Sequence, residues 1–138
     1  MAESTRQHGE ASPDELPAGL RVLIVDDMSN VLRTASSLVE ALGGRPTVAS
    51  SGTDAVDVLA RAPASADVVL MDVNMPGMDG IEALSRMRVI REDCPVVLSS
   101  GVAEPGPECG HDAFLAKPYT GAQLTAALRE AIERRAVR

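Results

Sequence analysis

From Leu20 onward, short apolar runs alternate with segments in which apolar residues recur at helical spacing. Continuous apolar runs of this length are typical of strands buried on both faces, and the amphipathic segments between them are typical of covering helices. The expected strands are 20–25, 46–50, 66–71, 95–100 and 113–116, and the expected helices begin near residues 29, 52, 80 and 120. We therefore expect an α/β fold in which helices cover both faces of a parallel sheet.

The connection between the last two expected strands differs from the other connections. Residues 101–113 read "GVAEPGPECGHDA" and contain Pro105, Pro107 and three glycines. A proline costs about 3 kcal/mol and a glycine about 1 kcal/mol in a helix interior. Two prolines and two glycines between residues 105 and 110 exceed what so short a segment could recover by packing. The sequence therefore predicts an irregular, mobile loop where a βα repeat would place its fourth helix.

The length of 138 residues suits one domain with one core. Residues 1–19 are polar and show neither a strand nor a helix period, so we expect a flexible tail followed by a domain at 20–138. A second catalytic domain or a helix-turn-helix domain would not fit in the remaining length. The chain is therefore expected to act without an attached output domain.

Composition restricts the partners and the compartment. The net charge of −7 argues against direct binding of nucleic acid or an anionic membrane and favours a cation or a protein partner. No apolar run approaches the roughly 18–20 residues of a membrane helix, which predicts a cytoplasmic protein. The two cysteines, Cys94 and Cys109, form no metal-binding or redox motif, and we expect reduced thiols.

Polar residues stand where the expected strands end. The first strand is followed by Asp26 and Asp27, the third by Asp72, the fourth ends in Ser100, and the fifth is followed by Lys117. In an open parallel sheet, ligands bind at the carboxyl ends of the strands, so these side chains should share one edge. Three clustered carboxylates repel one another unless a cation lies among them. A hard divalent ion such as Mg²⁺, which prefers oxygen ligands, would meet that requirement.

Asp72 lies within "VVLMDVNMPGMDG", directly after four apolar residues. A charged residue at the mouth of a buried strand is costly unless it is paired or functional. It could instead cap the next helix, but Gly80 begins that helix too far downstream. Turn-forming pairs at 76–77 and 79–80 indicate a loop that curves around Asp72.

Both aromatic rings of the chain lie in the segment "FLAKPY", on either side of Lys117. The sequence contains one Phe, Phe114, and one Tyr, Tyr119, and no Trp. Two rings cannot fill the core at large, so they are expected to act locally around Lys117. Because Pro118 follows, the backbone of Lys117 should be extended and its side chain should point in a fixed direction.

Together, "LIVDD", "VLMDVNMPGMDG", "PVVLSSG" and "FLAKPY" resemble the receiver domain of two-component response regulators, in the order and at about the spacing of that family. The chemotaxis regulator is the simplest relative, and the wording of the last two motifs is similar to receiver domains of hybrid histidine kinases. The resemblance covers residues 20–135. It implies a flavodoxin-like, doubly wound sheet with strand order 2-1-3-4-5.

The resemblance also implies the role of each acidic residue. Asp72 would accept a phosphoryl group from a phosphohistidine, which makes the protein a phosphoacceptor signalling domain rather than an enzyme. Asp27 and Asp72 would ligate Mg²⁺ directly, Asp26 would act mostly through water, and Asn74 would contribute its backbone carbonyl. The donor would be a sensor histidine kinase or a histidine phosphotransfer protein, and the downstream protein effector is unknown.

The remaining site residues would bind the phosphoryl group or respond to its presence. Ser100 and Lys117 would each hold a phosphoryl oxygen, and Phe114 would turn inward when Ser100 moves. Tyr119 would pack beneath the last helix and fix the Lys-Pro turn. Serine stands where many family members have threonine, so the coupling from Ser100 to Phe114 is expected to be looser.

Two other functions are compatible with parts of the pattern. The first is a phosphorelay or phosphate-sink receiver derived from a hybrid kinase, which would pass its phosphoryl group on without binding an effector. The second is an aspartyl-phosphate hydrolase of the haloacid dehalogenase type, which also uses a strand-end Asp and Mg²⁺. That family places a second Asp two residues after the nucleophile, and here the position is Asn74, which cannot act as a general acid.

Overall fold

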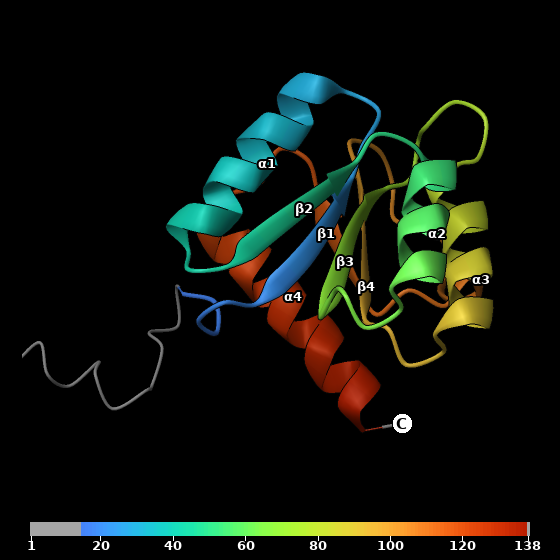
Figure 1. Cartoon of the computed structure of the whole chain (residues 1–138). Coiled ribbons are helices and arrows are strands. Elements are labelled where there is room, and N and C mark those ends of the chain that lie inside the picture. Colours follow the sequence, from blue (N-terminus) through green and yellow to red (C-terminus); the bar gives the residue numbers. More distant parts are fainter. Residues whose placement is uncertain (1–14, 138) are drawn as a thin grey trace, which may run out of the picture.

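The computed structural model describes residues 15–137 and contains one five-stranded parallel sheet covered by four α-helices (Figure 1). The elements are β1 Arg21–Val25, α1 Ser29–Ala41, β2 Arg45–Ala49, α2 Gly52–Arg61, β3 Val68–Asp72, α3 Gly80–Ile90, β4 Val96–Ser100, β5 Ala113–Ala116 and α4 Gly121–Ala136. The strand order is β2-β1-β3-β4-β5, and every pairing is parallel. The predicted fold and strand order are confirmed.

The helices lie in two layers, one on each face of the sheet (Figure 1). Alternate residues of β1 point to opposite faces, so Val22 and Ile24 pack with α1 and α4, whereas Leu23 and Val25 pack with α2 and α3. β3 and β4 are buried along their whole length. The sheet therefore separates two apolar clusters, and its buried strands support the residues at their carboxyl ends.

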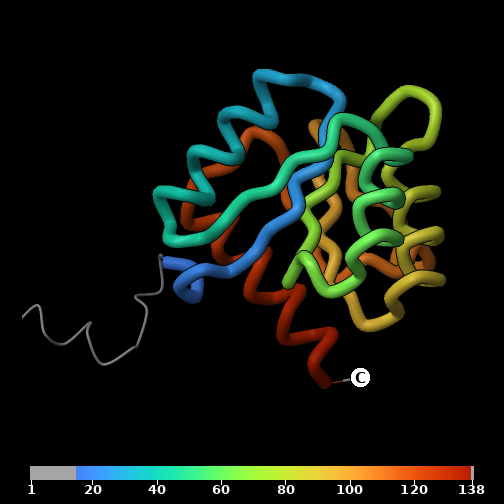
Figure 2. Tube along the Cα trace, in the orientation of Figure 1, coloured from blue at the N-terminus to red at the C-terminus, as the bar shows by residue number. Residues whose placement is uncertain are grey.

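Strand register brings the carboxyl ends together. Asp72 pairs with Ser99, and Ser100 pairs with Ala116, the residue before Lys117. Figure 2 shows the segments that follow β1 and β3 at the same end of the sheet, the upper end in this view. The predicted polar side chains thus share one edge.

Local capping sequences fix three of the helix starts. Ser51 and Asp79 accept hydrogen bonds from backbone N–H groups three residues ahead, at the starts of α2 and α3. Thr120 and Gln123 form a reciprocal capping box at the start of α4. The helix starts predicted near residues 29, 52, 80 and 120 agree with those of the four α-helices.

No α-helix forms between β4 and β5. Residues 101–112 contain only one 3₁₀ turn, η2 Pro107–Cys109, which ends at Gly110 with a φ of 85°. A positive φ is accessible to glycine without steric cost, so Gly110 both ends the turn and redirects the chain. The predicted absence of a regular helix here is confirmed, while the mobility of the segment stays a prediction.

The expected N-terminal tail lies mostly outside the described residues, which begin at residue 15. Its last residues pack on the domain: Leu16 is 2% exposed, and its N–H donates to the carbonyl of Leu42. Gly19 likewise donates to Gly43. Contacts with the core therefore begin at least four residues before the predicted boundary at Leu20, and a flexible tail remains a prediction for residues 1–14 alone.

Two other expectations concern membrane helices and cysteines. Across residues 15–137, none of the helices is long and apolar enough to span a membrane. Cys94 is buried, Cys109 is partly exposed, and both are free thiols.

Candidate functional site

Three carboxylates meet at the carboxyl edge of the sheet. Asp26 and Asp27 follow β1 directly, and Asp72 is the last residue of β3. One oxygen of each lies within 4.8 Å of the others. Asp26 and Asp72 are buried, whereas Asp27 is exposed. Within the described part of the chain, no other group of three potential metal ligands comes this close.

The loop after β3 is shaped so that α3 starts close behind Asp72. Gly80 donates its N–H to the carbonyl of Val73 at 2.9 Å. A Cβ at residue 80 would lie 2.3 Å from the carbonyl oxygen of Asp72, closer than real Cβ contacts. Glycine is therefore required at this position, because any side chain would displace the backbone that holds the Asp72 carboxylate.

Lys117 is the only lysine of the chain and bridges two of the acids. Its Nζ lies 2.8 Å from Oδ2 of Asp26 and 3.2 Å from Oδ1 of Asp72. Its backbone N–H donates to the carbonyl of Ser100, which extends the β4–β5 pairing to the edge of the site. The Lys117–Pro118 peptide bond is cis.

Burial and charge act on these groups in opposite directions. Burial raises the pKa of the Asp72 carboxyl, and the charge of Asp26 adds to the rise, while Lys117 partly offsets both. For Lys117, burial alone would lower the pKa, but its hydrogen bond to Asp26 and the charges of both acids outweigh burial and raise the pKa. Lys117 therefore stays protonated at neutral pH.

The donor set fits a hard divalent cation. With all groups ionised, three carboxylates and one ammonium leave two negative charges uncompensated. The oxygens are close enough to face one ion, and the exposure of Asp27 leaves room for water ligands. Mg²⁺ favours sites with few carboxylates and several waters.

Ser100 is fully buried, and its hydroxyl oxygen accepts two hydrogen bonds. The donors are the side-chain amide of Asn74 at 3.2 Å and the backbone N–H of Val102 at 3.0 Å. The sequence had suggested a role only for the backbone carbonyl of Asn74, and its side-chain contact was missed. The signal available was its place two residues after Asp72, within reach of the same edge of the sheet.

The two aromatic rings lie on opposite sides of the sheet. Phe114 is partly buried and packs with the cluster beneath α2 and α3. Tyr119 packs with the cluster beneath α1 and α4, and burial raises the pKa of its hydroxyl. Tyr119 and Pro118 also line an apolar groove of about 430 Å³ along α1. The two rings therefore pack on different faces of the sheet.

Comparison with known proteins identifies similar domains. Residues 22–129 match the model of the response regulator receiver domain. The chain is 33% identical to the sporulation initiation phosphotransferase F of Bacillus subtilis over 104 residues, which cover 72% of this chain and 82% of that protein. It is 36% identical to the regulatory protein AtoC of Escherichia coli over 118 residues, 82% of this chain but only 25% of AtoC.

A solved structure with the same fold carries a metal. It is the receiver domain of a sensor histidine kinase from Pseudomonas aeruginosa, with a magnesium ion coordinated in its active-site cleft. The TM-score is 0.75 at 28% identity, and the match covers 84% of this chain and 99% of that one.

Proposed function

The chain belongs to the response regulator receiver family, and from this premise we propose that Asp72 accepts a phosphoryl group from a phosphohistidine of a sensor histidine kinase or a histidine phosphotransfer protein. The observation that carries the proposal is the cluster of three acids within 4.8 Å, two of them bridged by Lys117. Asp72 is the one acid of the three that lies within the central strand β3 and also contacts the lysine.

A magnesium ion would lie among the carboxylates of Asp26, Asp27 and Asp72, with the backbone carbonyl of Asn74 as a further ligand. We expect direct ligation by Asp27 and Asp72 and a mostly water-mediated contact with Asp26. When bound, the ion would neutralise charge on the transferred phosphoryl oxygens. The magnesium ion in the related kinase receiver domain supports this assignment.

The protein side chains would supply position and charge. A carboxylate oxygen of Asp72 forms the new O–P bond while the N–P bond of the phosphohistidine breaks, and the imidazole leaves with the electron pair. Lys117 and the Ser100 hydroxyl would each hold one phosphoryl oxygen. Phosphoryl transfer requires little covalent help, so positioning and charge neutralisation are the main contributions of the protein.

Phosphorylation would then change the contacts of Ser100. The new group adds a charge of about −1.5 to −2 next to Lys117 and Ser100. Ser100 now accepts from Asn74 and Val102, so a shift of its hydroxyl toward the phosphoryl group would alter the start of the loop at 101–106. Phe114, which is paired with β4 at Leu98, would follow. Such a shift requires contacts that differ between the two states.

We infer that downstream proteins bind a surface formed by β5, α4 and the loop between β4 and β5. A groove of about 310 Å³ lies between β5 and α4 and is lined by Phe114, Ala116, Pro118 and Gln123, among others. No α-helix of the described residues separates β4 from β5, so this surface differs from one built around a fourth helix. We place this function in the cytoplasm, where histidine kinases use ATP.

Two modes of action remain for such a domain, a switch that binds an effector and a phosphorelay intermediate or phosphate sink. We propose the switch that binds an effector, and the similarity to a phosphotransferase favours the relay as the second candidate. Transfer from a panel of phosphorylated histidine kinases tests the proposal: one kinase should label the protein within seconds to minutes. No labelling by any kinase or by acetyl phosphate would overturn it. Onward transfer to a histidine phosphotransfer protein would select the relay.

Lys117→Ala should retain phosphorylation at a reduced rate but lose most of the conformational response. The Lys117 side chain is 25% exposed, so folding should survive although Asp26 loses its cationic partner. Because Phe114 is the only phenylalanine, a protein labelled with fluorophenylalanine gives one ¹⁹F signal from this ring. The signal should shift on phosphorylation in the parent and barely move in Lys117→Ala. Lys117→Arg, which keeps the charge, serves as the control, and equal shifts in parent and Lys117→Ala would contradict the assigned role.

A further inference from the structure

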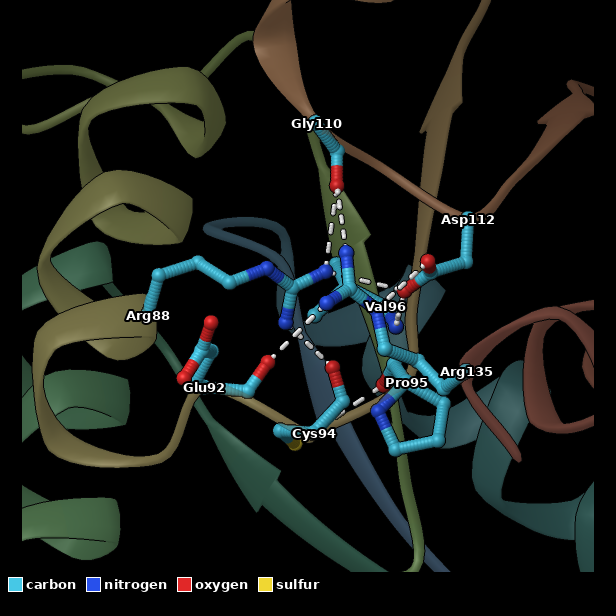
Figure 3. Close-up of polar contacts among 8 residues, drawn as sticks. All are labelled: Arg88, Glu92, Cys94, Pro95, Val96, Gly110, Asp112 and Arg135. Carbon is cyan, nitrogen blue, oxygen red and sulfur yellow. Dashed lines mark hydrogen bonds and ion pairs between the residues drawn. The ribbon is translucent and has the colours of Figure 1, made fainter. Parts of the chain in front are cut away.

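A buried ionic network lies away from the acids, at the amino ends of β4 and β5. Figure 3 shows the guanidinium groups of Arg88, from α3, and Arg135, from α4, next to each other and beside the carboxylate of Asp112. Arg88 Nη2 lies 2.9 Å from Oδ2 of Asp112, and Arg135 Nε lies 2.8 Å from Oδ1. Asp112 is fully buried, and the two arginine side chains are only 17% and 10% exposed.

The network also forms hydrogen bonds with the backbone near the amino ends of β4 and β5. Val96, the first residue of β4, donates its N–H to Oδ2 of Asp112 and accepts from the Asp112 N–H. Arg88 donates to the carbonyls of Cys94 and Gly110. The β4 and β5 amino ends, α3 and α4 are therefore joined through a single carboxylate (Figure 3).

Such a network contributes mainly to the relative placement of the elements that it joins, and less to the stability of the fold. Two guanidinium groups share one carboxylate, and burial lowers the pKa of Arg88 despite the attraction of Asp112. The cost of removing charged groups from water offsets much of the attraction between them, so a buried ionic network contributes little net stability. Loss of one partner is nevertheless costly, because it leaves the others buried without a compensating charge. Its charge-assisted hydrogen bonds, however, add geometric specificity to the packing of the four elements.

The two strands that the network fixes carry the phosphoryl-contacting residues at their other ends. β4 runs from Val96 to Ser100, and β5 leads from Ala113 to Lys117, whose N–H donates to the Ser100 carbonyl at 2.9 Å. Asp26 and Asp27 follow β1, and Asp72 ends β3. The side-chain hydrogen bonds of Arg88, Asp112 and Arg135 instead go to one another and to the backbone between residues 92 and 96 and at residue 110. In the described chain, η2 is the only helical turn between β4 and β5, so a packed α-helix is not available there to fix their relative position.

We propose that Asp112 is a positioning residue for phosphoryl binding, which acts through Arg88 and Arg135 to set the relative placement of Ser100 and Lys117. The proposal rests on the proposed function, in which these two residues hold phosphoryl oxygens. It separates two steps at one site: cation binding depends on β1 and β3, whereas phosphoryl binding depends on β4, β5 and this network.

Arg135→Gln tests the proposal, with Arg134→Gln as the matched control. Arg134 is the preceding residue on α4, its side chain is 60% exposed, and it forms an ion pair with Glu130 on the same helix. Calorimetric titration gives the Mg²⁺ affinity, and beryllofluoride in the presence of Mg²⁺ serves as the phosphoryl probe. We expect beryllofluoride affinity to fall about tenfold in Arg135→Gln, since a misplacement of about 1 Å can cost about a hundredfold in catalysis. Mg²⁺ affinity should stay within about twofold in both variants, because Arg135 pairs with Asp112 and Arg134 with Glu130, and neither pairs with the three acids that face the cation.

Rescue distinguishes positioning from loss of stability. Arg135→Lys, which retains the charge but not the planar fork, should recover part of the beryllofluoride affinity. All variants are compared at a temperature where circular dichroism shows each to be folded, and Arg88→Gln replaces Arg135→Gln if the latter does not fold. A parallel fall of Mg²⁺ and beryllofluoride affinity, or unchanged affinity for both, would overturn the positioning role. A parent that binds Mg²⁺ but no beryllofluoride would overturn the proposed function together with this inference.

Discussion

Asp27→Ala should abolish phosphorylation of Asp72 by acetyl phosphate while leaving the fold intact. Asp27 is exposed, so its removal should cost little stability. Its carboxylate is nevertheless one of the three oxygen donors that face the cation position. A metal ion contributes several kcal/mol to charge stabilisation in the transition state, so we expect the rate to fall about 100-fold or more.

The control for this variant is Asp57→Ala, which removes an exposed acid from α2, far along the chain from the site. Its phosphorylation rate should equal that of the parent, because Asp57 is not one of the three acids that face the cation. The total charge changes by the same amount in both variants, so the comparison separates the role of Asp27 from a general effect of charge. Chelation of divalent cations by EDTA should reproduce the Asp27→Ala result in the parent. A rate that withstands both EDTA and Asp27→Ala would show that no cation takes part.

Asp112→Asn should lower the stability of the protein by several times more than the loss of an exposed ion pair does. The asparagine keeps the shape of the side chain but leaves Arg88 and Arg135 buried without a compensating charge. Removing one partner of a buried ion pair typically costs about 3–5 kcal/mol. Urea unfolding should show a lower midpoint with little change in slope, because the surface exposed on unfolding stays the same.

Asp93→Asn is the matched control for that measurement. Asp93 pairs with Arg91 at 3.2 Å, but its side chain is 82% exposed. Exposed pairs of this kind contribute about 0–1 kcal/mol, so the midpoint should hardly move. Equal losses in the two variants would mean that the Asp112 carboxylate is not the centre of the buried network.

Local signals explain why much of the fold could be predicted from the sequence. The helix at 80–90 follows Asp79, which caps it, and the absence of a fourth helix follows from Pro105, Pro107 and Gly110. Both features depend on residues that lie next to the structure they determine. The acids were placed at one edge because parallel strands end together, which needs only their positions relative to the apolar runs.

Contacts between distant segments could not be predicted in the same way. Arg88 and Arg135 each lie on a helix where a charged residue is usually solvated, and nothing in their spacing links them to Asp112. The polar neighbours of Leu16 predict a tail, whereas in the structure Leu16 is buried and its N–H donates to the carbonyl of Leu42 at the end of α1. These contacts result from tertiary packing, which no local period encodes.

The location of the phosphoryl group tests the central proposal most directly. The parent and Asp72→Asn are incubated with acetyl phosphate and Mg²⁺ and compared by intact-protein mass spectrometry, followed by peptide mapping. The parent should gain one phosphoryl group on the peptide that contains Asp72, and hydroxylamine should remove it, as expected for an acyl phosphate. Asp72→Asn should gain none, although Asp26, Asp27 and Lys117 are all retained. Labelling of Asp72→Asn at the rate and extent of the parent would contradict the assignment of Asp72 as the phosphoacceptor.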